Sequence, residues 1–272
     1  MWKACAFSNA ARNGVFAAML AQLGMTGPSP IFEGEKGFMK LVSGPLELAP
    51  FAVEQGQAPT HSGSQFPQFK ILDTYIKRYP VEYHAQTAIE AALILRAELM
   101  ESEGERAIEQ IVDIEIGSYD VAIEIIGRDP EKWQPATRET ADHSFPYCVA
   151  VALLYGHVTL QSFGPKRLHD PAVRDLMKKI RVVKQPEFMG CYPKTMPTRI
   201  TVKTHAGKTY MSQVDVPVGH PGNPMSDQDL EAKFRRLASG RLNRFRIDRL
   251  IEFVWTLDRI KDIGTLMPLL RM

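Results

Sequence analysis

Residues 76–97 read IKRYPVEYHAQTAIEAALILRA and join an extended segment to the start of a helix. Pro80 fixes its own φ and disfavours helical geometry at the residue before it, so no regular helix passes through this point. Beyond Pro80, apolar side chains recur at helical spacing, at Ala85, Ala88, Ile89, Ala92 and Leu93. The segment therefore predicts a helix that begins near residue 82 and packs one apolar face against other elements.

Four charged or titratable side chains gather where this helix starts. Lys77 and Arg78 precede Pro80, and Glu82 and His84 follow it. The free N–H groups and the positive partial charge of a helix N-terminus favour a carboxylate ligand. The alternative interpretation is a surface turn whose charges face water, and the local pattern does not separate the two.

Composition limits the class of protein. The 272 residues, 44% of them hydrophobic, are enough for one large core or two ordinary ones. The 33 basic and 31 acidic residues nearly balance, and no basic stripe is interleaved with aromatic residues, so nucleic acid is not an expected partner. No apolar run reaches the roughly eighteen residues that a membrane helix needs, so no membrane span is expected.

Polar residues interrupt the N-terminal stretch MWKACAFSNAARNGVF, so we expect no signal peptide. Cys5, Cys148 and Cys191 are odd in number and far apart. This spacing is typical of reduced thiols in a cytosolic protein rather than of a disulfide framework, a zinc site or an iron–sulfur cluster. The cysteines therefore predict a cytoplasmic protein, and no metal site is expected, because Asp and His residues do not gather at ligand spacing either.

Helices are expected at both ends of the chain. Small side chains in residues 8–24 would let another helix approach closely, and Gly24 is expected to end this helix. Glycine and proline are frequent in residues 25–69, which predicts ordered loop with one short helix near residues 34–42. His61–Ser64 belongs to this loop, because it lacks the strand and helix that frame a phosphate-binding loop. Residues 242–257 are expected to form an amphipathic helix.

The middle of the chain predicts a sheet. Residues 112–116 alternate apolar and charged side chains, which is the pattern of a half-buried strand. Further strands are expected over 180–184, 198–204 and 208–216, the last two joined by a hairpin turn that contains Gly207. Helices are expected over 82–99, 119–126, 140–158 with Pro146 in its first turn, from about 170, and after an N-cap at Ser226.

This order of elements predicts an α+β protein. An α+β domain of about four strands is inserted between two parts of an all-helical domain. The expected boundaries are residues 1–69 for the first helical part, 70–222 for the inserted domain and 223–272 for the C-terminal helices that return to the helical domain.

Four separated segments resemble the MmgE/PrpD family and occur in the family's order. They are residues 2–28 (WKACAFSNAARNGVFAAMLAQLGMTGP), 77–92 (KRYPVEYHAQTAIEAA), 141–153 (ADHSFPYCVAVAL) and 218–234 (VGHPGNPMSDQDLEAKF). The family includes 2-methylcitrate dehydratase, cis-aconitate decarboxylase and iminodisuccinate epimerase. The Glu82-Tyr83-His84 motif is more similar to the dehydratases than to the decarboxylases.

Family members carry a long all-helical segment before the position that Trp2 and Lys3 match, so the chain resembles a C-terminal portion of the family fold. The resemblance implies that residues 1–69 are truncated on their N-terminal side and that residues 70–222 are a lid domain. It also implies a homodimer. Three explanations stay open: a misassigned start, a separate chain that supplies the missing helical half, or a non-catalytic remnant.

The resemblance implies a cofactor-free active site in which side chains exchange protons with a small polycarboxylate. Lys3 and Lys77 match active-site lysines of the family, and Tyr147 matches an active-site tyrosine. With His84, these are the expected catalytic residues. Without the family, Lys3 is a terminal amine, Lys77 a solvated cation on a turn, and Tyr147 a core residue with a polar tip.

The expected substrate-binding residues are Glu82, His143 and Arg78. The function that the resemblance implies is dehydration of 2-methylcitrate or a related acid by acid–base catalysis. One alternative is another family reaction, decarboxylation or epimerisation of a related acid. The other is a non-catalytic product that only oligomerises, through apolar faces of residues 8–24 and 242–257.

Overall fold

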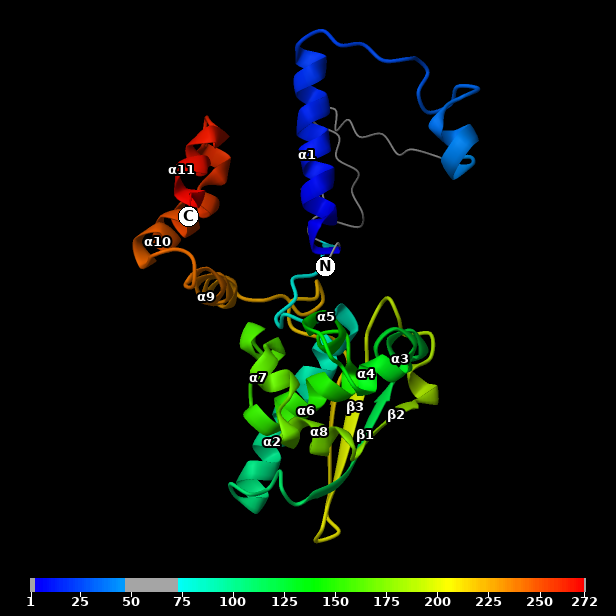
Figure 1. The fold of residues 1–272 in the computed structure, drawn as a ribbon, viewed down its shortest axis with the longest axis vertical. Coiled ribbons are helices and arrows are strands. Elements are labelled where there is room, and N and C mark those ends of the chain that lie inside the picture. Colours follow the sequence, from blue (N-terminus) through cyan, green and yellow to red (C-terminus); the bar gives the residue numbers. More distant parts are fainter. Residues whose placement is uncertain (1–2, 47–72, 272) are drawn as a thin grey trace, which may run out of the picture. The chain divides into compact units, whose positions relative to one another are not determined.

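A computed structural model describes residues 3–46 and 73–271, together with the side chains of all of these except Lys3 and Ala4. Two compact units make up the chain, residues 1–70 and 71–272 (Figure 1). In the first unit, α1 spans Lys3–Gln22, so it begins five residues before the predicted start, and a short π-helical turn spans Met39–Ser43. Gly24 has a φ of 90°, the left-handed geometry expected just beyond a helix end. The predicted loop at His61–Ser64 lies outside the described residues.

The second unit holds a four-stranded mixed sheet with the strand order β2-β1-β3-β4. The strands are β1 Ile111–Ser118, β2 Ile180–Lys184, β3 Thr198–Thr204 and β4 Thr209–Val214. β1 is parallel to β2 and antiparallel to β3, and β3 forms a hairpin with β4. The predicted α+β class with four strands is confirmed, and β2 and β3 have the predicted bounds.

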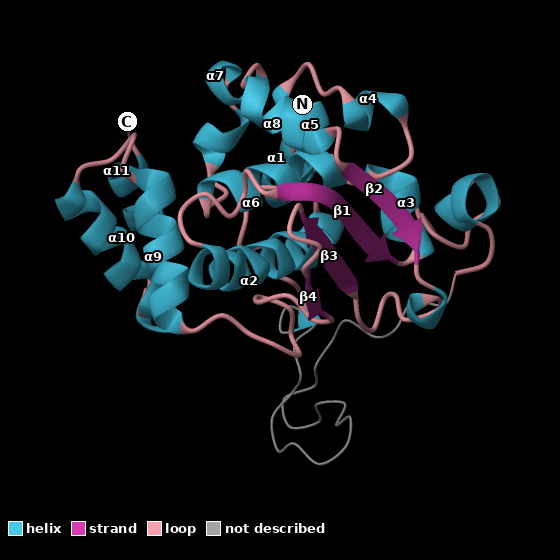
Figure 2. Cartoon of the chain, turned by 90° about the horizontal axis from the view of Figure 1, so that it is seen from below, coloured by secondary structure: helices cyan, strands magenta, loops and turns pink. Residues whose placement is uncertain are grey.

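Helices α2 and α6 cover one face of this sheet (Figure 2). α2 packs against β3 and β4, and α6 packs against α2 and β2. The uncovered face carries charged side chains, and Arg181 forms ion pairs there with Asp113 and, at 2.8 Å, with Glu115. This alternation between a packed face and a solvated face is the arrangement expected of a sheet with antiparallel pairs.

α2 spans Gln86–Glu103 and follows a 3₁₀ turn at Tyr83–Ala85. α6 spans Phe145–Tyr155, and Gly156 ends it with a φ of 68°. The predicted single helix over 140–158 is wrong in its first part, because α5 ends at Ala141 and α6 begins only at Phe145. Ser144 separates them, since its hydroxyl accepts from the Tyr147 N–H at 3.1 Å and caps α6.

The remaining helical segments of the second unit are short or lie near its C-terminal end. They are α3 Asp120–Ile126, α4 Pro130–Trp133, α5 Arg138–Ala141, a 3₁₀ turn Leu160–Phe163, α7 Pro165–Leu168, α8 Pro171–Met177, a 3₁₀ turn Pro186–Phe188, α9 Asp227–Ala238, α10 Arg244–Trp255, 3₁₀ turns Leu257–Arg259 and Ile263–Leu266, and α11 Met267–Leu270. The predicted N-cap is confirmed, because the Ser226 hydroxyl accepts from the Asp229 N–H at 3.1 Å. Among the described residues, no helix combines the length and apolar character that a bilayer crossing requires.

Candidate active site

The extended segment before α2 is fixed at both of its ends. The Ile76 N–H donates to the Gly219 carbonyl at 2.8 Å, and the Glu82 N–H donates to the Asp142 carbonyl at 2.8 Å. Between these anchors, the Lys77 ammonium donates to the Val81 carbonyl at 2.9 Å. The charged residues predicted at this helix start therefore lie on an ordered backbone.

Glu82 caps the turn that leads into α2. One of its carboxylate oxygens accepts from the His84 N–H at 2.7 Å, which satisfies a donor at the helix start. The other oxygen remains an acceptor for a further partner. His143 lies near this corner, because the carbonyl of the preceding residue, Asp142, accepts from the Glu82 N–H, and the Asp142 carboxylate accepts from His143 Nδ1 at 2.5 Å.

His84 is buried and forms a hydrogen bond through Nδ1 with the hydroxyl of Tyr119, the residue that follows β1. Tyr119 is also buried, and the half-exposed ring of Tyr192 stacks on it with a centroid distance of 5.7 Å. Burial lowers the pKa of His84, opposed by the nearby Glu82 carboxylate. Burial, with Glu82 as the next cause, raises the pKa of Tyr119. At neutral pH the pair is therefore a neutral imidazole joined to a protonated phenol.

A neutral imidazole can accept a proton, and a phenol can donate one. A proton can pass between groups joined by a hydrogen bond, which is the arrangement that general acid–base catalysis uses. Tyr119 and Tyr192 are not among the predicted site residues. The only signal for Tyr119 was its place at the start of the predicted helix over 119–126, and Tyr192 lies in a loop with no distinguishing pattern.

Tyr147 lies in the core of the unit. Its side chain is fully buried, and its hydroxyl donates to the Ser162 carbonyl at 2.7 Å. Burial raises its pKa. The described contacts therefore give Tyr147 a structural partner, and its predicted catalytic role stays a prediction. Lys3 is the first residue of α1, and its side chain lies outside the described residues.

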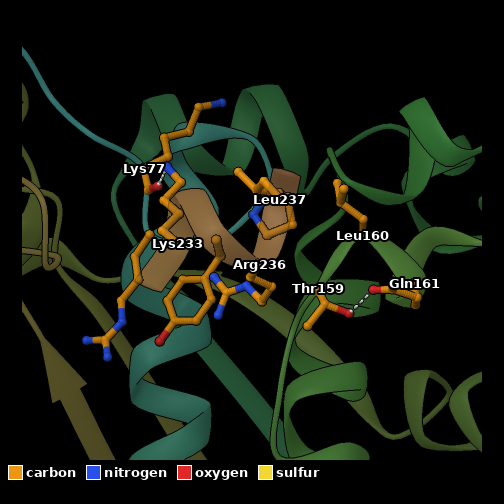
Figure 3. Close-up of a pocket in the computed structure, with 10 residues that line it drawn as sticks. Lys77, Thr159, Leu160, Gln161, Lys233, Arg236 and Leu237 are labelled. Carbon is orange, nitrogen blue, oxygen red and sulfur yellow. Dashed lines mark hydrogen bonds between the residues drawn. The ribbon is translucent and has the colours of Figure 1, made fainter. Parts of the chain in front are cut away.

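A cavity of about 280 Å³ opens beside Lys77 and Arg78 (Figure 3). Its other walls come from the turn after α6 and from α9. The lining residues are Lys77, Arg78, Tyr79, Pro80, Thr159, Leu160, Gln161, Lys233, Arg236 and Leu237. The structure thus adds Lys233 and Arg236 to the two predicted cations, and no periodicity in the sequence of α9 distinguishes them from other surface charges.

Comparison with known families assigns nearly the whole second unit. Residues 79–259 match the model described as the MmgE/PrpD C-terminal domain, and residues 1–50 match that of the MmgE/PrpD N-terminal domain. The chain belongs to the MmgE/PrpD family. The resemblance carried by the four sequence segments is confirmed.

Among curated proteins, the chain is similar to cis-aconitate decarboxylase of Homo sapiens, with 29% identity over 270 residues that cover 97% of this chain and 51% of that protein. The corresponding decarboxylase of Mus musculus is 28% identical over 271 residues. The 2-methylcitrate dehydratase of Escherichia coli K12 is 31% identical over 147 residues, which cover 52% of this chain and 29% of that protein. The chain spans about half the length of the decarboxylases that it matches.

Proposed function

We propose that this MmgE/PrpD chain forms part of a lyase that acts on a small polycarboxylate by side-chain acid–base catalysis. The observation that carries the proposal is the buried hydrogen bond between His84 and Tyr119, beside the carboxylate of Glu82. The family supports the class of reaction, since its curated relatives include a dehydratase and decarboxylases.

Elimination of water next to a carboxylate needs a base for the carbon-bound proton and an acid for the departing hydroxyl group. His84 is neutral at pH 7 and can serve as the base. Tyr119 stays protonated and can return a proton. Because the two are hydrogen-bonded, one proton can move along the pair without a metal or a cofactor. The reaction that fits both roles is dehydration of 2-methylcitrate or a closely related acid.

A second candidate is decarboxylation of cis-aconitate. The curated decarboxylases match nearly all of this chain, whereas the dehydratase match covers about half of it. Loss of carbon dioxide leaves a carbanion that must be protonated, and the Tyr119–His84 pair can supply that proton. The two reactions therefore use the same pair and differ in whether a base is needed first.

Turnover tests the proposal. The purified chain is mixed with 2-methylcitrate, with cis-aconitate or with iminodisuccinate. Each acid is tested with the chain by itself and with the chain plus the part of the human decarboxylase that lies outside the matched segment. The unsaturated product or substrate is followed by its ultraviolet absorbance, and the epimers are separated by chromatography. We expect consumption of 2-methylcitrate or cis-aconitate in at least one arm, and consumption of no acid in any arm would contradict the proposal.

Two tyrosine variants identify the proton donor. Tyr119→Phe keeps the ring but removes the hydroxyl, and we expect turnover to fall about 100-fold, the usual size of a general acid contribution. Tyr210→Phe is the matched control, because its hydroxyl donates to Glu103, the last residue of α2, at the opposite end of that helix from His84. Equal turnover by Tyr119→Phe and the unaltered chain would assign the acid elsewhere, and the same measurement on Tyr147→Phe would then test Tyr147.

A further inference from the structure

The cavity in Figure 3 has an unusual balance of charge. Four cationic side chains line it, Lys77 and Arg78 on one wall and Lys233 and Arg236 on α9, and no carboxylate is among its lining residues. Among the described residues, none of the four forms an ion pair within 4.0 Å of a carboxylate oxygen. By contrast Arg235, the neighbour of Arg236 on the same helix, is paired with Asp248 and Glu231.

Two carboxylates lie near one edge of this cluster without neutralising it. Glu90 accepts from the Val218 N–H at 3.0 Å, and burial raises its pKa, with Arg78 acting in the opposite direction. The Asp229 carboxylate accepts from the Ser226 hydroxyl at 2.7 Å, which is the main reason that its pKa is lowered, and Arg78 adds a smaller effect. Both carboxylates thus have hydrogen-bond partners of their own, and Arg78 lowers the pKa of each.

The four cations that line one cavity repel one another, and an anion between them would offset this repulsion. Burial, followed by the charges of Lys77 and Arg236, lowers the pKa of Lys233. An anion in the cavity would offset the last two effects, because its charge favours the protonated form of Lys233. A bound anion would therefore offset the repulsion among the four cations.

Hydrogen-bond donors are left over on both walls. Lys77 donates to the Val81 carbonyl and Lys233 to the Lys77 carbonyl, which leaves each ammonium two further protons. Across the cavity, the Thr159 hydroxyl donates to the Gln161 side-chain oxygen Oε1 at 2.9 Å, so the side-chain amide nitrogen of Gln161 is a remaining donor (Figure 3). The apolar lining of Pro80, Leu160 and Leu237 suits a short carbon chain between carboxylates.

We propose that this cavity binds the carboxylates of a small polycarboxylate anion and that Lys233 and Arg236 of α9 determine its selectivity for multiply charged acids. The inference rests on the proposed function for its substrate class, because the segment that lines the cavity continues from Lys77 into Glu82 and His84. Its size of about 280 Å³ lies at the lower end for ligand pockets, which favours a small acid over a nucleotide.

Calorimetric titration with tricarballylate, an unreactive tricarboxylate, tests the site on the full 272-residue chain. We expect saturable binding that Arg236→Gln and Lys233→Gln each weaken about tenfold or more, the effect of losing one charge-assisted hydrogen bond. Arg236→Lys, which keeps the charge, should restore part of the affinity. Arg235→Gln is the matched control, since it removes the same charge from the same helix outside the cavity, and it should change the affinity by no more than about twofold.

Inorganic phosphate and acetate form separate arms. Binding of phosphate as tight as that of tricarballylate would overturn the proposal, because the cavity would then be a general anion site. Absence of saturable tricarballylate binding, or equal weakening by Arg235→Gln, would overturn it as well. Thermal unfolding of each variant, monitored by circular dichroism, shows whether the variant is folded before its affinity is compared.

The same variants separate this site from the reaction. Intact, selective tricarballylate binding without turnover of any acid contradicts the proposed reaction and leaves the site standing. Turnover that Arg236→Gln and Lys233→Gln leave unchanged, together with unchanged affinity, contradicts the site and leaves the reaction standing.

Discussion

Helices α1 and α2 are similar in sequence and opposite in environment. Both are long and combine several alanines with large apolar side chains, although α2 carries five charged residues and α1 two. In α2, nine of the eighteen residues are buried, among them Ala88, Ile89 and Leu95. In α1, by contrast, large apolar side chains are exposed in the described structure, with Phe7 at 89% and Phe16 at 60%. A pattern of small and apolar residues thus predicts that a helix needs a partner without identifying which partner covers it.

The physical reason lies in what each helix contacts. α2 fills the space between β3, β4 and α6, and its alanines allow this close approach. The apolar area that α2 removes from water stabilises the second unit. The exposed face of α1 makes no comparable contribution in the chain as described, so substitutions in the two helices should have very different effects.

Core truncation should give the largest difference. Leu95→Ala in α2 removes a fully buried side chain, and we expect the free energy of unfolding to fall by about 2–5 kcal/mol. Met19→Ala in α1 removes a side chain that is 58% exposed, and we expect a change within about 0.5 kcal/mol. Urea unfolding followed by circular dichroism measures both. Equal effects of the two substitutions would mean that α1 is packed as well as α2.

The segment that leads into α2 should be the next most sensitive. Gly219 has a φ of 97°, and a Cβ there would lie 1.9 Å from the Ile76 carbonyl oxygen. Gly219→Ala should therefore displace Ile76 and cost about 1–3 kcal/mol of unfolding free energy. Gly190→Ala is the control, because Gly190 has a φ of 75° with nothing within 4 Å of its Cβ position. This substitution should lose only the free energy needed to hold an alanine at a positive φ. A smaller loss for Gly219→Ala than for Gly190→Ala would contradict the close approach.

The two regions should also differ in their dependence on pH. Burial lowers the pKa of His84 at the start of α2, whereas α1 contains no histidine. Below about pH 6.5 the unfolded chain binds a proton at His84 that the folded chain does not, so the free energy of unfolding falls as the pH drops below that value.

Other groups also contribute to the pH dependence, because burial lowers the pKa of His220 and raises that of Glu90. These groups are present in both the unaltered chain and His84→Gln, so the difference between the two proteins isolates the contribution of His84. We expect the loss of stability between pH 7.5 and 5.5, measured by urea unfolding, to be smaller in His84→Gln. A steeper loss in the variant would mean that His84 is protonated in the folded chain.

Substitutions on the exposed apolar face of α1 should have the smallest effect on the free energy of unfolding but should change how the chains associate with one another. Exposed apolar patches of roughly several hundred Å² promote contacts between molecules. We expect the chain to oligomerise, and the double variant Phe16→Ser and Met19→Ser to shift light scattering toward the monomer while its unfolding free energy changes by no more than about 0.5 kcal/mol. A monodisperse monomer of the unaltered chain would contradict this expectation.

Much of the fold was predictable because it depends on local patterns. The alternation of apolar and polar residues located β1 and β3, and the hydroxyl of Ser226 marked the start of α9. The break between α5 and α6 was missed. The Ser144 hydroxyl caps α6 and also donates to the Lys132 carbonyl, twelve residues earlier in the chain, and the sequence around Ser144 does not reveal this tertiary contact.

The candidate site was predicted only in part. Lys77, Arg78, Glu82 and His84 lie together because they are neighbours in the chain, and a sequence records such proximity directly. Tyr119 reaches His84 from 35 residues away, and Lys233 reaches Lys77 from 156 residues away. No local pattern could reveal these pairs.

The sequence by itself determined the family, the α+β class and the residues that surround the entry to α2, because these depend on the order and spacing of residues along the chain. Tertiary structure alone decided that β1 runs parallel to β2, that Tyr119 is the partner of His84, and that α9 completes a cavity lined by four cations. The reason is that long-range pairing follows from which buried surfaces fit together, and that fit is a property of the packed chain rather than of any one segment.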